Sequence, residues 1–331
     1  MVTLPRIGRR RALQAGTAGL AVLGLLLWWL LSMGAAPSPK GRVTLATGVP
    51  SGVYERYGRL LRQDLGQDLP DLKVRLVRSE GSVDNLRQLA SGRADFAIAT
   101  ADAVADYQAR HEPDAGRLRA CARLYDDYMQ LIVPKDSTVR TTRDLKRLRV
   151  GVGADGSGVQ LVTKRLLAAA GLDFHRDVRP VRTGIDEMPA LLARGELDAF
   201  FWSGGLPTSA VQELARKFPI RLVPLADLIE PLHRQGETAR YYRAAVMPAD
   251  AYPVIQRGQA IKTIAVANLM VTTDRADPGL TEGITRTVIR SRDWIGREVH
   301  AAQKVDLRTA VFTDPLALHQ GAQRYYRSEK P

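Results

Sequence analysis

The chain has 331 residues, of which 45% are hydrophobic and 25% are charged, and its formal net charge is +13 at pH 7. This length can bury one or two ordinary hydrophobic cores. The single cysteine excludes an internal disulfide framework, and its position among apolar residues such as Leu118 and Leu124 favours a buried small side chain over a nucleophile. The arginines are scattered and not clustered with aromatic residues, so nucleic-acid binding is not expected.

Residues 1–41 are expected to form a signal or membrane anchor and a linker. Arginines 6 and 9–11 precede a continuous apolar stretch, residues 18–33, which is typical of an export signal. The stretch is long for a cleaved signal and slightly short for a membrane span, so cleavage and retention as an anchor both stay open. No cysteine follows it to carry a lipid. We therefore expect a periplasmic protein that residues 18–33 could anchor to the cytoplasmic membrane.

Alternating short apolar strands and helical stretches predict an α/β fold. In chain order we expect a strand at 43–46, a helix at 54–67, a strand at 72–77, a helix that begins near 82 and a strand at 96–99. Two later apolar segments, 130–133 and 261–273, are predicted to cross between two lobes as antiparallel hinge strands. Residues 281–291 and the region beyond are predicted to be helical and to cover the first lobe.

One short pattern, Leu-x-x-Gly-x-x-Asp followed by apolar residues, occurs twice. It starts at Leu89 and again at Leu192, and a strand that runs into a glycine-rich turn and a helix lies upstream of each copy. The repeat predicts two similar α/β lobes. Lobe 1 is expected to comprise residues 42–130 plus 265–331, and lobe 2 residues 131–264.

The repeat places glycine-rich turns, residues 47–52 and 156–158, at the starts of two helices. Backbone N–H groups at a helix start have no intrahelical partner and lie at the positive end of the helix dipole, so an anion held between the lobes would meet donors from both sides. The alternative is that glycine and serine here only form turns and caps.

Catalysis is not expected from this set of residues. The five histidines form no metal-ligand pair, and there is no Cys-x-x-Cys, His-Glu-x-x-His or phosphate-binding loop. We therefore expect no catalytic residue, no metal site and no cofactor. The loop after the second repeat carries Trp202 and Thr208, and ligands in open α/β sheets bind at such strand ends. Trp202 could form an apolar wall for a ligand or be an ordinary core residue between the lobes.

Six motifs in series resemble those of the TAXI-type solute-binding proteins of TRAP transporters. They are Thr47-Gly48-x-x-Ser51-Gly52-x-Tyr54-x-x-x-Gly58, Gly81-Ser82-Val83-x-Asn85-Leu86, Asp102, Asp155-Gly156-Ser157-Gly158, Gly205-x-Pro207 and His319-x-Gly321-Ala322-x-x-Tyr325-Tyr326. The resemblance extends from residue 42 to the C-terminus. It implies a type II periplasmic-binding-protein fold that captures a small organic anion, commonly a dicarboxylate or acidic amino acid, and passes it to a membrane permease driven by an ion gradient.

Three positions depart from the family pattern. Glu55 replaces a tyrosine and would oppose an anion if it faced the cleft, and Asp102 follows Thr100-Ala101 where the family has Gln-Ser. The family's glutamate after Leu-Tyr corresponds to Asp127. These departures bear on the identity of the ligand.

Together, the residues and the resemblance predict a non-enzymatic binding protein of a TRAP-type transporter. The expected ligand-binding residues are Thr47, Gly48, Ser51, Gly52, Tyr54, Ser82, Asn85, Asp102, Gly156, Ser157, Gly158, Trp202 and Thr208. The two turns would hold the anion by their N–H groups, Ser82, Asn85 and Ser157 would add side-chain contacts, and Tyr54 and Trp202 would pack the apolar part. A membrane-anchored metabolite sensor that uses the same cleft for signalling is the alternative, and a periplasmic enzyme on the same lobes lacks a nucleophile or metal set.

Overall fold

The computed structural model describes residue 24 and residues 39–329. The predicted anchor, residues 18–33, therefore lies outside the described residues except for position 24. In the part of the chain that is described, no helix is both long and apolar enough to cross a membrane.

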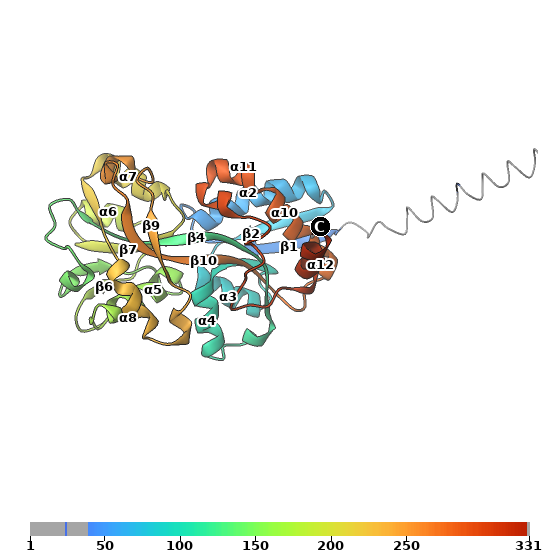
Figure 1. Ribbon diagram of the computed structural model, residues 1–331, viewed down its shortest axis with the longest axis horizontal. Coiled ribbons are helices and arrows are strands. Elements are labelled where there is room, and N and C mark those ends of the chain that lie inside the picture. The colour runs from blue at the N-terminus through green and yellow to red at the C-terminus, as the bar shows by residue number, and fades with distance from the viewer. Residues whose placement is uncertain (1–23, 25–38, 330–331) are drawn as a thin grey trace, which may run out of the picture. The chain divides into compact units, whose positions relative to one another are not determined.

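The segment from Pro39 onward is one compact unit with helices on both faces of a central sheet (Figure 1). Its first elements follow the sequence prediction closely. They are β1 (Gly41–Ala46), α2 (Val53–Asp68), β2 (Leu72–Val77), α3 (Ser82–Ala90), β3 (Phe96–Thr100) and α4 (Ala101–Ala109). We call these elements, with the C-terminal helices described below, the first half.

The second half has the same strand and helix alternation. Its elements are β5 (Arg149–Gly151), α5 (Gly158–Ala169), β6 (Arg179–Val181), α6 (Met188–Ala193), β7 (Ala199–Gly204), α7 (Ser209–Lys217), β8 (Ile220–Val223), α8 (Ile229–His233), β9 (Arg243–Met247) and α9 (Pro253–Gln256). The chain then returns to the first half, where α10 (Pro278–Arg290), α11 (Arg292–Glu298) and α12 (Gln320–Ser328) follow. Residues of α10 and α12 share a buried apolar cluster with β1 and α2.

Two long strands, β4 (Leu118–Pro134) and β10 (Ile261–Thr273), connect the halves. They pair antiparallel through the middle of a ten-stranded sheet in the order β2-β1-β3-β10-β4-β7-β5-β6, with β8 on β4 and β9 on β10. In Figure 1 they run horizontally between the two groups of helices. The prediction of two antiparallel connecting strands is confirmed. However, β4 begins twelve residues before the predicted start at residue 130. Polar residues such as Arg119 and Asp127 interrupt the apolar residues of 118–129, so this part of the strand was not recognised from the sequence.

The repeated pattern has the same structural role in both halves. Gly92 and Gly195 each have φ +71 after a helix, a conformation that glycine adopts without strain. The aspartate that follows each of them bonds the neighbouring parallel strand: Thr44 N donates to Asp95 Oδ2 at 2.8 Å, and Arg149 N donates to Asp198 Oδ2 at 2.7 Å. The repeat therefore fixes β3 beside β1 and β7 beside β5.

Two other sequence predictions concern burial and domain limits. Cys121 is buried, and burial raises the pKa of its thiol to about 12, so a nucleophilic thiolate is disfavoured at neutral pH.

The limits of two separately moving lobes, residues 42–130 plus 265–331 and residues 131–264, stay a prediction, since the described chain from Pro39 is a single compact unit.

Two glycines in α2 give a matched test of packing. A Cβ at Gly58 would lie 2.5 Å from Thr47 Cγ2, whereas nothing lies within 4 Å of a Cβ at Gly66. We expect Gly58→Ala to lower the free energy of unfolding by about 1–3 kcal/mol, because it overpacks the contact between α2 and β1. Gly66→Ala should raise it by up to about 1 kcal/mol, because alanine favours the helix. Urea denaturation measures both, and equal effects would contradict the packing argument.

Candidate functional site

A cavity lies where the carboxyl ends of parallel strands from both halves meet. The space between its side chains is about 610 Å³ including its opening to solvent. Its walls come from the turns after β1, β5 and β6, from the ends of β3 and β7, from the middle of β4 and from the starts of α2, α3 and α5. Strand ends in open α/β sheets are the usual place for a ligand.

The starts of α3 and α5, one from each half, both line this cavity and contact each other. Asp84 N in α3 donates to Gly156 O at 3.0 Å, and a Cβ at Gly158 would lie 3.0 Å from Ser82 Oγ. In α5 the side chain of Ser157 caps the helix by accepting from Gln160 N at 3.0 Å. Asp84 N and Gln160 N are thus engaged, and the first two N–H groups of each helix, at residues 82–83 and 158–159, are the ones whose position gives them no intrahelical partner.

A chain of hydrogen bonds runs from the end of β3 to the centre of the cavity. Thr100 N donates to Ser82 Oγ at 3.2 Å, and Ser82 Oγ lies 3.1 Å from Tyr54 Oη. The Tyr54 hydroxyl donates to Asn268 Oδ1 at 2.5 Å, and Asn268 Nδ2 donates to Asp127 Oδ1 at 2.8 Å. These hydrogen bonds connect side chains of α3, α2, β10 and β4, and they hold these side chains around one carboxyl group, that of Asp127.

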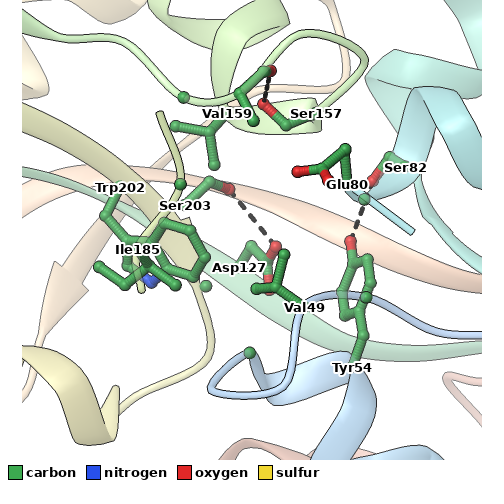
Figure 2. Close-up of a pocket in the computed structure, with 18 of the residues that line it drawn as sticks. Val49, Tyr54, Glu80, Ser82, Asp127, Ser157, Val159, Ile185, Trp202 and Ser203 are labelled. Carbon is green, nitrogen blue, oxygen red and sulfur yellow. Dashed lines mark hydrogen bonds between the residues drawn. The ribbon is translucent and has the colours of Figure 1, made fainter. Parts of the chain in front are cut away.

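Asp127 is the carboxyl group at the end of that chain. Its side chain lies between those of Trp202 and Tyr54, and Ser203 Oγ donates to its Oδ2 at 3.4 Å (Figure 2). The residue is 3% exposed, and burial raises the pKa of its carboxyl to about 7 despite the hydrogen bonds from Asn268 and Ser203. Among the described residues no lysine, arginine or histidine lines the cavity or forms an ion pair with Asp127.

Apolar side chains form the rest of the walls. They belong to Val49, Val53, Val159, Ile185 and Trp202. The indole Nε1 of Trp202 donates to Thr208 Oγ1 at 3.0 Å, so its polar atom is satisfied away from the cavity. Trp202 both lines the cavity and belongs to a buried apolar cluster, and its contact with a ligand stays a prediction.

The structure brings together seven of the thirteen predicted site residues. Gly48, Gly52, Tyr54, Ser82, Ser157, Gly158 and Trp202 line the cavity. Five of them belong to the glycine-rich turns or to the helix starts that follow, as expected from the repeat. No cluster of three or more histidine, cysteine, aspartate or glutamate side chains that could hold a metal occurs in the described ranges.

The other six predicted residues lie outside the lining, and four of them are buried and bonded to other groups. Thr47 Oγ1 donates to Glu55 Oε2 at 2.6 Å, and the Asn85 amide donates to Thr47 O at 2.6 Å and Ile98 O at 2.8 Å. Asp102 accepts from Tyr242 Oη at 2.6 Å, and Thr208 holds the Trp202 indole.

Ser51 and Gly156 lie towards solvent. The exposed Ser51 donates to Asp186 in the second half, and Gly156 has φ +83 in the turn before α5 and lines a different pocket. Glu55, expected to oppose an anion if it faced the cleft, accepts from Thr47 and is not part of the lining.

Several residues in or beside the cavity were not singled out from the sequence, among them Ser203, Asn268, Glu80 and Ile185. Ser203 and Asn268 lie within the apolar strands β7 and β10, and Glu80 and Ile185 lie in turns. A polar residue interrupting an apolar strand was the available signal for Ser203 and Asn268.

A model of the NMT1-like family matches residues 45–329 of the chain. Several solved structures are similar in fold. A protein from Bordetella bronchiseptica RB50 has a TM-score of 0.54 at 19% identity, covering 88% of this chain and 90% of that one. The alkanesulfonate-binding protein SsuA from Xanthomonas axonopodis pv. citri, bound to MOPS, has a TM-score of 0.52 at 17% identity, covering 90% and 86%.

The binding-protein component of an ABC phosphonate transporter from Pseudomonas aeruginosa has a TM-score of 0.52 at 10% identity, covering 80% of each chain. At these identities the likeness concerns the fold. The chain has the periplasmic-binding-protein fold that its motifs implied, with two α/β halves joined by β4 and β10.

The raised pKa of Asp127 gives a prediction about stability. Its folded-state pKa of about 7 lies above the usual aspartate pKa of 3.8, so its contribution to stability is complete below pH 3.8 and is lost as the pH rises through 7. Asp127→Asn removes this loss, and we expect the variant to be more stable than the natural chain at pH 8, by up to about 4 kcal/mol, and equally stable near pH 4. Denaturant unfolding at both pH values measures the difference.

Asp126, the preceding residue of β4, is the matched control. It forms ion pairs with Arg123 at 2.7 Å and with Arg243. Asp126→Asn should therefore destabilise the protein at pH 8, because it leaves two partly buried guanidinium groups without their partner. Destabilisation by both variants at pH 8 would contradict the assignment of Asp127 as an unfavourable buried charge.

Proposed function

The chain belongs to the NMT1-like family, and we propose that it is an extracytoplasmic solute-binding protein that captures a small organic solute between its two halves and delivers it to a membrane transporter. One similar solved structure is an alkanesulfonate-binding protein and another is the binding-protein component of an ABC phosphonate transporter, which supports this role. The observation that carries the proposal is the cavity itself, which both halves build and which the hydrogen-bond chain from Ser82 to Asp127 organises. We propose no catalytic activity.

Capture follows from the position of the cavity between the halves. A solute that contacts the start of α3 on one side and the start of α5 on the other gains both sets of contacts only when the halves are close together. Binding therefore shifts an open to closed equilibrium by the difference in affinity between the two states. Within this proposal, β4 and β10 act as the hinge between two lobes, which comprise residues 42–130 plus 265–331 and residues 131–264.

A carboxylate is the acidic group that we propose for the solute. The first-turn N–H groups of α3 and α5 would bind it, in keeping with the small organic anion, dicarboxylate or acidic amino acid, that the sequence resemblance implies. The ligand names of two similar structures, an alkanesulfonate and a phosphonate, also denote acids. No basic side chain lines the cavity in the described chain, so the helix starts carry this contact.

The partner that we propose is the membrane permease of a TRAP-type transporter, on the strength of the TAXI-type motifs. The apolar stretch at 18–33 supports a position on the outer face of the cytoplasmic membrane, by export or by retention as an anchor. A membrane-anchored sensor would use the same cavity. Loss of solute uptake in a deletion strain supports transport, whereas intact uptake with a lost transcriptional response supports sensing.

Native mass spectrometry of the exported protein, purified without unfolding, tests solute capture directly. We expect a co-purifying small molecule that is displaced on unfolding. Small-angle scattering should then show a smaller radius of gyration after that molecule is added back to the stripped protein. A protein that carries no solute and does not change shape with any periplasmic extract would contradict the proposed function.

Gly158 provides a variant that acts on closure. Since a Cβ there would lie 3.0 Å from Ser82 Oγ, Gly158→Ala should keep α5 away from α3 and favour the open state. We expect about tenfold weaker solute binding, equivalent to about 1.4 kcal/mol, and a larger radius of gyration in the ligand-free protein. Gly66→Ala, where the added Cβ meets nothing within 4 Å, is the control and should leave both measurements unchanged.

A further inference from the structure

Asp127 differs from the other buried aspartates in what balances its charge. Asp126 is ion-paired with Arg123 and Arg243, and Asp102 accepts from Tyr242, whose ring lies 5.7 Å from the Arg165 guanidinium. Asp127 accepts only from the neutral side chains Asn268 and Ser203. A buried carboxylate without a cation is unfavourable unless another charge approaches it, and Asp127 is the one of these three that lines the cavity.

The hydrogen-bond chain leaves Asp127 as an acceptor towards the cavity. The Asn268 amide donates to Asp127 and its oxygen accepts from Tyr54, so both ends of the amide are committed. The Tyr54 proton is used on Asn268, and Ser82 in turn accepts from Thr100 N. A carboxylate oxygen can accept further hydrogen bonds. The group that complements Asp127 from the cavity is therefore a donor.

The surroundings favour a charged donor with an apolar body. The exposed Glu80 also lines the cavity, so the two carboxyl groups of the lining, Asp127 and Glu80, favour a cation in the cavity over a second carboxylate of the solute. The facing walls are apolar and include Val159, Ile185 and Trp202. These side chains offer no hydrogen-bond partner to a polar solute chain.

We propose that Asp127 binds a protonated amino group of the solute, so that the ligand is an apolar amino acid or a related amine and not a dicarboxylate. This inference rests on the proposed function, because it assigns the solute of the same cavity. Together with a carboxylate at the starts of α3 and α5, it describes a zwitterion whose apolar part lies against Trp202.

The proposal carries a pH dependence. The titratable groups that interact with Asp127 are Tyr125 of β4, Tyr54 of α2 and Asp102 of α4, and β7 and β10 contribute the neutral Ser203 and Asn268. Glu80, before α3, lines the same cavity. Burial raises the pKa of Tyr54 and Tyr125 well above their usual value, so both stay neutral near pH 7. Protonation of Asp127 below about pH 7 removes the partner of the amino group, and affinity for an amine falls.

Calorimetry with matched probes tests the inference on the exported full chain. We would compare L-leucine, 2-hydroxyisocaproate, isoamylamine and succinate at pH 8 and pH 5.5. We expect leucine to bind at least one hundredfold more tightly than the hydroxy acid at pH 8, isoamylamine to bind detectably, and leucine to weaken at least tenfold at pH 5.5. Valine and methionine are measured as well, because they carry the same amino and carboxylate groups as leucine on apolar side chains of other sizes.

Variants separate this assignment from a structural effect. Asp127→Asn, whose fold is verified by circular dichroism and thermal unfolding, should reduce the preference for leucine over the hydroxy acid to less than tenfold and abolish its pH dependence. Asp71→Asn, an equal charge change at an exposed position, should change neither.

Some outcomes overturn the inference alone. These are preference for succinate or the hydroxy acid, failure of every amine to bind while a solute without an amino group co-purifies, and unchanged affinity of Asp127→Asn for an amine at pH 8. Failure of every probe to bind, with no co-purifying solute and no closure, overturns the proposed function as well.

Discussion

The antiparallel pairing of β4 with β10 is the constraint on which the rest of this structure depends. The two strands share register from Tyr128 opposite Ala265 to Leu118 opposite Thr273. In addition, β10 pairs with β3 of the first half and β9 of the second half, and β4 pairs with β7 and β8 of the second half. Every other strand takes its position in the sheet from them. The pairing also brings Asp127 and Asn268 together, which are far apart in the sequence and form the centre of the cavity.

Around this pair the protein uses one local design twice. In each half an aspartate after a helix stop accepts from the backbone of the parallel strand beside it, and a strand, a turn and a helix start follow the same order. Because the two copies face each other, both sets of strand ends point at the same space. A duplicated unit that is ordinary in each half thus creates a cavity with helix starts on opposite sides.

The cavity combines features that do not maximise stability. A carboxyl group is buried among neutral donors and apolar side chains, where its ionised form is disfavoured. Nearby positions on the same strand are occupied by well-packed apolar residues or by an ion-paired aspartate. Such local costs concentrate at binding sites, since a group that is satisfied within the protein has little to offer a ligand.

The sequence by itself determined the elements and their repetition. Apolar periodicity located β2 and β10 to the residue, because it depends on local residue types. For the same reason the glycine-rich turns and the predicted helix start at residue 82 located Gly48, Gly158 and Ser82, which line the cavity. Only the tertiary structure decided which polar side chains face the cavity. Asn85 looked suited to a ligand, yet its amide donates to two backbone carbonyls, whereas Asn268 and Ser203 flank Asp127. Strand register and packing between distant segments set these directions, and a local pattern contains no record of either.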